Sequence, residues 1–193
     1  FAAPIVADTG WSLFWVVSGT SVGLLIAGLI SPRVGAIIDR RGGRPVLACS
    51  SMLYAAGLLG IAFAPNLPSY LLAWGVLGCG MGTGLYDAAF AALGKLYGRD
   101  ARAPITNLTL FGGFSSTVCW PLSAFLIEWI GWRYACAVYA VAHLAIALPL
   151  QLAVMPPLAQ AVARTENSQT PKTDGVRPLP NQRLIFVLLA LVL

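Results

Sequence analysis

The stretch 35–44 carries the residues whose types and spacing best suit a defined chemical task. It reads Gly-Ala-Ile-Ile-Asp-Arg-Arg-Gly-Gly-Arg, so that Asp39 lies close to three arginines. Asp39 and Arg44 can form an ion pair across a tight turn, because Gly42 and Gly43 permit positive φ angles there. Gly35 lacks a side chain, so a second helix backbone can approach it closely. The chemistry indicated is reversible ion pairing between elements, or anchoring at a lipid surface, rather than the breaking of covalent bonds.

Three side chains inside apolar stretches are further candidates, because polar groups in such a setting usually face a cavity or a partner. His143, the one histidine, can titrate near neutral pH and couple a process to protons, or it can be a neutral core histidine hydrogen-bonded to a neighbour. Asp87 can pair with Arg40 or Arg44, or it can contact a substrate. Trp120 can line a cavity or pack against a neighbouring helix.

The sequence holds no recognisable arrangement for covalent catalysis or metal binding. It contains neither His-Glu-x-x-His nor Gly-x-Ser-x-Gly, and its four cysteines form no Cys-x-x-Cys pair. The glycines at 78–84 are spaced like those of a nucleotide loop, but they lie within an apolar stretch and follow no strand. We therefore expect no catalytic residues, no metal, no cofactor and no enzymatic activity.

The elements that position these residues are predicted to be membrane-spanning helices. Hydrophobic residues make up 58% of the chain and charged residues only 10%, whereas a soluble domain is about 25% charged. A helix needs about 20 residues to cross the hydrocarbon core. Apolar segments of that length lie at 11–31, 45–65, 69–93, 105–129 and 134–156. Their continuous apolar character argues against barrel strands, and we predict an all-α polytopic bundle.

The chain divides into three regions by composition. Residues 1–156 are predicted to form the transmembrane bundle, truncated at its start, with five complete spans. Residues 157–183 are polar and rich in disorder-favouring types, which predicts a linker. Residues 184–193 are apolar and begin the next span. Because the chain starts at Phe1 and stops within an apolar run, we expect a fragment of a longer protein.

The distribution of basic residues predicts the orientation. Of the 12 Lys and Arg residues, eleven lie in or beside the connections 32–44, 94–104 and 157–183, and only Arg133 lies on the opposite side. The positive-inside rule places those three connections in the cytoplasm. This pattern is typical of membrane topology rather than of a phosphate-binding face, so we expect no nucleic-acid partner.

The order of these features closely resembles major facilitator superfamily transporters. The motif Gly-x-x-x-Asp-Arg-x-Gly-x-Arg is followed by a glycine-rich helix, a Pro-containing helix ending in Gly131-Trp132-Arg133, a further helix and a long basic linker. That order resembles the second to sixth helices of the family, with parts of the first and seventh. The family has twelve helices in two six-helix halves, so the resemblance implies most of the amino-terminal half.

The resemblance also implies a function and roles for the motif. It implies secondary active or facilitative transport of a small solute by alternating access, in a bacterial inner membrane, with H+ as a candidate coupling ion. The lipid bilayer and the missing carboxy-terminal half are the implied partners. In the family the aspartate and the last arginine help to latch the two halves on the cytoplasmic side, which favours the outward-facing state. The implied gating residues are Gly35, Asp39, Arg40, Gly42 and Arg44, with Asp87 as a candidate gate partner.

Two departures from the family pattern narrow the transport type. The arginine that the family often has early in the third full segment is absent from 72–75. The Gly-Pro with paired glycines of the antiporters is replaced by Trp120, Pro121 and their neighbours. The first departure argues against the usual proton-coupling element of the family's drug antiporters, and the second favours a uniporter or symporter. A membrane-embedded lipid-modifying enzyme and a non-transporting membrane scaffold remain alternative functions.

Overall fold

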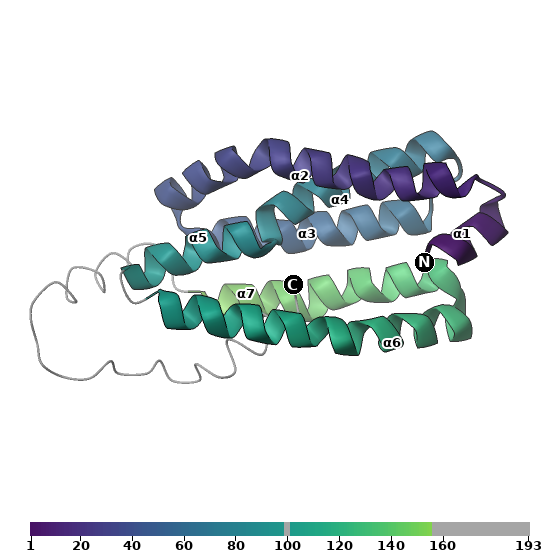
Figure 1. The fold of residues 1–193 in the computed structure, drawn as a ribbon. Coiled ribbons are helices and arrows are strands. Elements are labelled where there is room, and N and C mark those ends of the chain that lie inside the picture. The colour runs from purple at the N-terminus through teal and green to yellow at the C-terminus, as the bar shows by residue number, and fades with distance from the viewer. Residues whose placement is uncertain (99–100, 156–193) are drawn as a thin grey trace, which may run out of the picture.

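Helices account for every regular element that the structure, a computed structural model, describes in residues 1–98 and 101–155. In chain order they are α1 (Ala2–Thr9), α2 (Leu13–Arg41), α3 (Gly43–Ala62), α4 (Leu67–Gly84), α5 (Tyr86–Tyr97), α6 (Arg102–Ala142), the π-helix η2 (His143–Ala147) and α7 (Leu148–Val154). Figure 1 shows the long helices side by side, with the short α1 at one end of the bundle. The predicted all-α class is confirmed.

The helical segments are long and apolar enough to cross a membrane. Within the described residues four segments meet that condition, at 13–41, 43–62, 67–97 and 102–153. The fourth contains Gly131, whose φ of 81° and ψ of 161° are not helical. The chain reverses there and runs back beside the first part of α6 toward α7 (Figure 1). The five predicted passes are therefore present, two of them within one helical segment.

The helices extend beyond the predicted connections, which corrects the expected loop bounds. The prediction of a connection over 32–44 was wrong in extent, because α2 continues through Pro32 to Arg41 and only Gly42 separates it from α3. Apolar composition marks where a segment enters lipid, not where its hydrogen bonding ends. At about 1.5 Å per residue, the 29 residues of α2 exceed a hydrocarbon core of about 30 Å.

Glycines on α4 allow it to pack closely against two helices at once. A Cβ atom added to Gly78 would lie 2.5 Å from the carbonyl oxygen of Gly23 in α2. Gly84 lies on the face of α4 that packs against α3, and a Cβ atom added to it would lie 2.7 Å from Oγ of Ser50. Gly82 likewise meets α2, while Gly80 meets the α3 backbone. The close helix contacts predicted from this glycine spacing are confirmed.

The predicted span 69–93 is not one continuous helix. Leu85 is extended, with a ψ of 179°, and separates α4 from α5. Its N–H donates to Met81 O, and its carbonyl accepts from the N–H groups of Ala88 and Ala89. The break thus leaves few backbone groups unpaired, as an apolar surrounding requires. Glycine has a low helix propensity, and Gly84 lies directly before the break.

Candidate functional site

The turn between α2 and α3 is built on two glycines with different roles. Gly42 has a φ of 82°, which favours glycine, and its N–H donates to Ile38 O at 2.8 Å. Gly43 is already helical, and a Cβ atom on it would lie 2.4 Å from Cβ of Ala92 in α5. The predicted positive φ is confirmed at Gly42 but not at Gly43, where close packing excludes a side chain.

The predicted close approach at Gly35 is absent from the described part of the chain. A Cβ atom added to Gly35 would meet nothing within 4 Å. Its neighbours Val34 and Ile38 are buried and pack in a cluster with Val46, Leu47, Ala88, Ala92 and Met155. The packed face of α2 therefore lies beside Gly35, and the Gly35 position itself is open.

The backbone, rather than the carboxylate, of Asp39 is held by a neighbouring element. The Asp39 carbonyl oxygen accepts a hydrogen bond from Nζ of Lys95 in α5, and the Asp39 side chain is exposed. The last carbonyls of a helix have no intrahelical partner, and a lysine is well suited to satisfy them. The sequence indicates Lys95 only as a topology signal, because it does not show that the ends of α2 and α5 meet.

Neither predicted ion pair of this turn forms in the described residues. The one ion pair in residues 1–98 and 101–155 joins Asp8 to Arg133, far from the turn in sequence. Nε of Arg44 is buried without a hydrogen-bond partner. Asp87 is exposed in the first turn of α5, where an acidic group interacts favourably with the helix dipole. The turn therefore presents an unpaired carboxylate from Asp39 and an unsatisfied guanidinium donor from Arg44.

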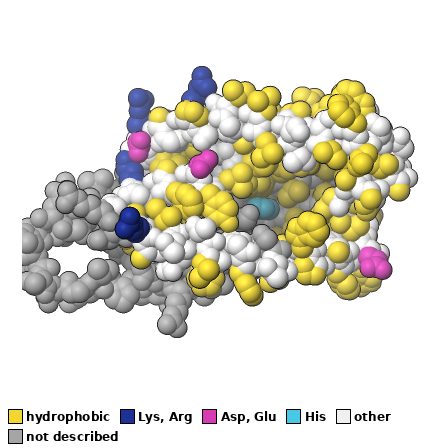
Figure 2. Space-filling model, in the orientation of Figure 1, with side chains coloured by type: hydrophobic (Ala, Val, Ile, Leu, Met, Phe, Trp, Pro, Cys, Tyr) yellow, Lys and Arg dark blue, Asp and Glu magenta, His cyan; other side chains and the backbone are white. Residues whose placement is uncertain are grey.

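The structure groups basic side chains at the end of the bundle that carries this turn. The end of α2, the end of α5 and the start of α6 lie together there (Figure 1). Figure 2 shows the Lys and Arg side chains of this face gathered at that same end. The basic residues at the ends of these helices are Arg40 and Arg41 in the last turn of α2, Arg44 at the start of α3, Lys95 in the last turn of α5 and Arg102 at the start of α6. This is the surface that the positive-inside rule predicts to face the cytoplasm.

His143 is the first residue of η2, and its side chain contacts α3. Its ring stacks on Tyr54, with centroids 4.9 Å apart and an interplanar angle of 16°, and its Nδ1 is buried without a partner among the described residues. Ser51 lies one turn before Tyr54 on α3. The Oγ of buried Ser51 donates to Oε1 of buried Gln151 in α7 at 2.8 Å. Figure 2 shows the one cyan side chain recessed in a hollow of the molecular face. Single-turn π segments are frequent at functional sites.

The sequence indicates His143 but neither its ring partner Tyr54 nor the hydrogen bond between Ser51 and Gln151. Ser51, Tyr54 and Gln151 are polar residues inside apolar runs, which was the available signal. Their spacing along α3 and α7 does not show which of them meet. Trp120 on α6 is 82% exposed. It therefore does not pack against a neighbouring helix of the described residues, which was one of the two alternatives predicted for it.

Comparison with known proteins gives one family over the whole chain. A model of the family described as Major Facilitator Superfamily matches residues 1–193. No solved structure matches the chain significantly.

Three curated relatives match over part of their length. A Thermoproteus tenax protein described as "Uncharacterized 38 kDa protein in 23S RNA operon" is 35% identical over 137 residues, covering 70% of this chain and 35% of the relative. Monocarboxylate transporter 11 of Mus musculus is 33% identical over 130 residues, covering 66% of this chain and 27% of the relative. Niacin transporter NiaP of Acinetobacter baylyi is 31% identical over 123 residues, covering 63% of this chain and 27% of the relative. The chain thus spans between 27% and 35% of the length of these relatives.

Proposed function

This chain belongs to the major facilitator superfamily, and from that premise we propose that it forms most of one half of a secondary transporter. The transporter moves a small solute by alternating access, in which two helical halves rock about a central site. The observation that carries this proposal is the exposed, unpaired carboxylate of Asp39 beside a single-glycine turn. Such a carboxylate is free to bind a group on another body and to release it.

The proposed gate consists of Gly35, Asp39, Arg40, Gly42 and Arg44. In the cytoplasm-closed state Asp39 contacts the carboxy-terminal half, and Arg44 holds Asp39 in place. Two observations support this assignment: the position at Gly35 is open, and Nε of Arg44 is buried without a partner. A buried donor without an acceptor is costly, so a state in which Arg44 pairs with Asp39 or with Asp87 would be stabilised.

The proposed location is a bacterial inner membrane, with connections 32–44, 94–104 and 157–183 in the cytoplasm. The basic end of the bundle supports this orientation through the positive-inside rule (Figure 2). The lipid bilayer covers the exposed apolar helix faces. The linker 157–183 and the predicted span 184–193 lie outside the described residues. Labelling of an Arg41→Cys variant from the two sides of oriented vesicles tests the orientation. Reaction of that cysteine from the extracellular side would reverse the proposed orientation.

His143 is the proposed proton-coupling residue. Replacing it with glutamine is expected to abolish the stimulation of uptake by an inward proton gradient, because a glutamine side chain does not take up a proton. Solute exchange without a gradient should persist. Ser51→Ala is the matched control, because it removes a neighbouring hydrogen bond but no titratable group. Gradient-driven uptake by His143→Gln at the wild-type level would leave His143 as a neutral core residue.

Uptake by purified full-length protein in proteoliposomes tests the proposed function against its alternatives. The names of two relatives, a monocarboxylate transporter and a niacin transporter, make those two solute classes the first to be measured. Protein-dependent accumulation of unmodified solute inside the vesicles is the expected result. Chemical conversion of an added lipid without solute movement would favour the membrane-embedded enzyme. The absence of both activities across the solute panel would favour a scaffold.

A further inference from the structure

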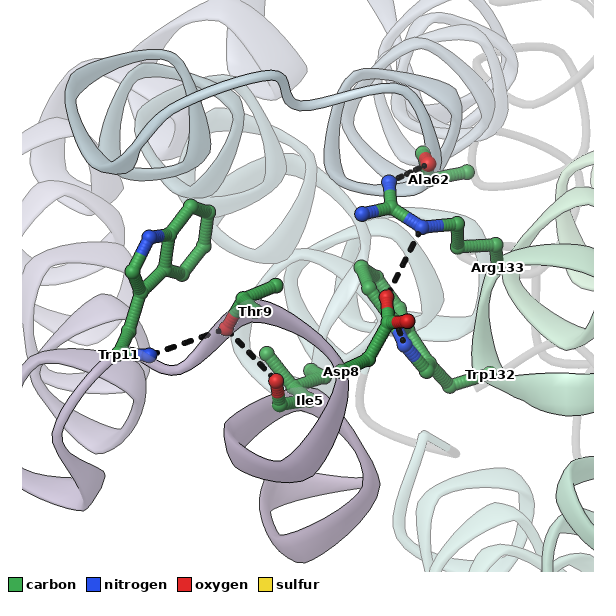
Figure 3. Close-up of polar contacts among 7 residues, drawn as sticks. All are labelled: Ile5, Asp8, Thr9, Trp11, Ala62, Trp132 and Arg133. Carbon is green, nitrogen blue, oxygen red and sulfur yellow. Dashed lines mark hydrogen bonds and ion pairs between the residues drawn. The ribbon is translucent and has the colours of Figure 1, made fainter.

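The end of the bundle opposite the gate is joined by a compact polar cluster, shown in Figure 3. Nε of Arg133 pairs with Oδ2 of Asp8 at 3.3 Å, and Nη1 of Arg133 donates to the carbonyl oxygen of Ala62 at 2.8 Å. The guanidinium lies over the Trp132 ring at 4.4 Å, and Nε1 of Trp132 donates to the same Asp8 oxygen at 3.2 Å. We call Asp8, Ala62, Trp132 and Arg133 the outer tie.

The outer tie connects α1, α3 and α6 at its end of the described bundle. The ends of α2 and α4 on that side are not part of it. Asp8 lies at the end of α1, and Ala62 is the last residue of α3, with a carbonyl that has no intrahelical partner. Trp132 and Arg133 follow Gly131, where α6 reverses. One arginine therefore holds three separate elements. Figure 3 shows its guanidinium between Ala62 and Asp8.

Apolar packing beneath the outer tie joins the same elements. Ile5 of α1, Ile61 of α3 and Trp132 of α6 belong to one buried cluster, which also contains Tyr70 of α4. The hydroxyl of Tyr70 donates to Val16 O of α2 at 3.0 Å, so α2 and α4 are joined to the cluster as well. At the gate end, Lys95 of α5 donates a side-chain hydrogen bond to the Asp39 carbonyl oxygen of α2.

We propose that Arg133 is a positioning residue for transport, because it makes the outer ends of this half move as one body. The inference rests on the proposed alternating-access function. Rocking transmits a movement at the cytoplasmic gate to the opposite end only if the helices of a half keep their relative positions. Arg133, the one basic residue at this end among residues 1–98 and 101–155, thus acts as a tie between turns and not as a lipid anchor.

The test uses the full-length transporter with Arg133→Met, Arg133→Lys and Asp8→Asn. Asp8→Asn is expected to have the smallest effect of the three, because Asp8 and Arg133 are 51% and 41% exposed and a partly exposed pair contributes little. Arg133→Met also loses the Ala62 contact, so turnover per folded transporter should fall about fivefold or more. Arg133→Lys should recover part of that loss. Glu128→Gln, which removes an exposed charge on the same side outside the outer tie, is the matched control and should behave as wild type.

A spectroscopic measurement separates positioning from simple stabilisation and does not depend on transport. Spin labels at exposed Ala3 and Val138 report the distance between α1 and α6, and labels at Leu25 and Leu72 report the α2–α4 distance as a reference. Arg133→Met should broaden the α1–α6 distance distribution and leave the α2–α4 distribution narrow. An unchanged α1–α6 distribution together with wild-type turnover would overturn the proposal. Broadening in a protein that moves no solute would retain the tie and reject the transport function.

Discussion

Replacing Gly78 with valine is expected to reduce the yield of folded protein about tenfold or more. A Cβ atom at this position would lie 2.5 Å from Gly23 O and 2.8 Å from Gly23 Cα, so the obstacle is backbone and not a movable side chain. The two helices would have to separate along a contact that also includes Gly82. Overpacking a well-packed interior costs about 1 to 3 kcal/mol even where side chains can adjust, and a tenfold change needs only about 1.4 kcal/mol.

The measurement is the monodisperse fraction after detergent extraction, compared with Gly28→Val. Gly28 lies on α2, where an added Cβ atom meets nothing within 4 Å, so its valine variant carries the same change in residue type without the clash. A wild-type yield for Gly78→Val would mean that α2 and α4 do not pack as described.

Replacing Asp39 with asparagine is expected to slow transport about tenfold while membrane insertion stays intact. The Asp39 side chain is exposed and forms no ion pair among the described residues, so the fold of this half does not depend on its charge. A hydrogen bond to a charged group contributes about 1.5 to 3 kcal/mol. Losing such a bond only in the cytoplasm-closed state would shift the equilibrium between the two states by about tenfold or more.

Initial uptake rates per reconstituted transporter measure this effect, with Asp39→Glu and Arg33→Gln alongside. Asp39→Glu keeps the carboxylate and should retain part of the activity. Arg33→Gln removes an exposed charge on the same helix outside the motif, and it should transport normally. If Asp39→Asn transported at the wild-type rate, the charged turn would be a lipid-surface anchor, because an anchor does not distinguish transport states.

Composition was sufficient to predict the class of fold and the number of passes, since apolar runs long enough to cross lipid leave few alternatives. The glycine spacing of α4 also predicted real close contacts, at Gly78 and Gly84. Helix ends were predicted less well. Nothing in the sequence showed that α2 would remain helical past Pro32 or that the chain would break at Leu85.

The candidate site shows the same limit, because pairing depends on how distant elements meet. Asp39 and Arg44 are close in sequence, yet a helical α2 followed by a turn at Gly42, which has a positive φ, leaves them unpaired. Lys95 was not expected to hold the end of α2, and Arg133 was not expected to pair with Asp8, 125 residues away. Residue types indicated which groups carry charge, but the arrangement of the helices decided their partners.

Counterflow in proteoliposomes tests alternating access most directly. Vesicles containing the purified full-length protein are loaded with unlabelled solute, and the entry of labelled solute is followed with no other gradient. Alternating access predicts a transient accumulation of label above its external concentration, because the binding site returns occupied and carries label inward faster than it leaves. Entry that only equilibrates, at a rate independent of the internal solute, would contradict this account.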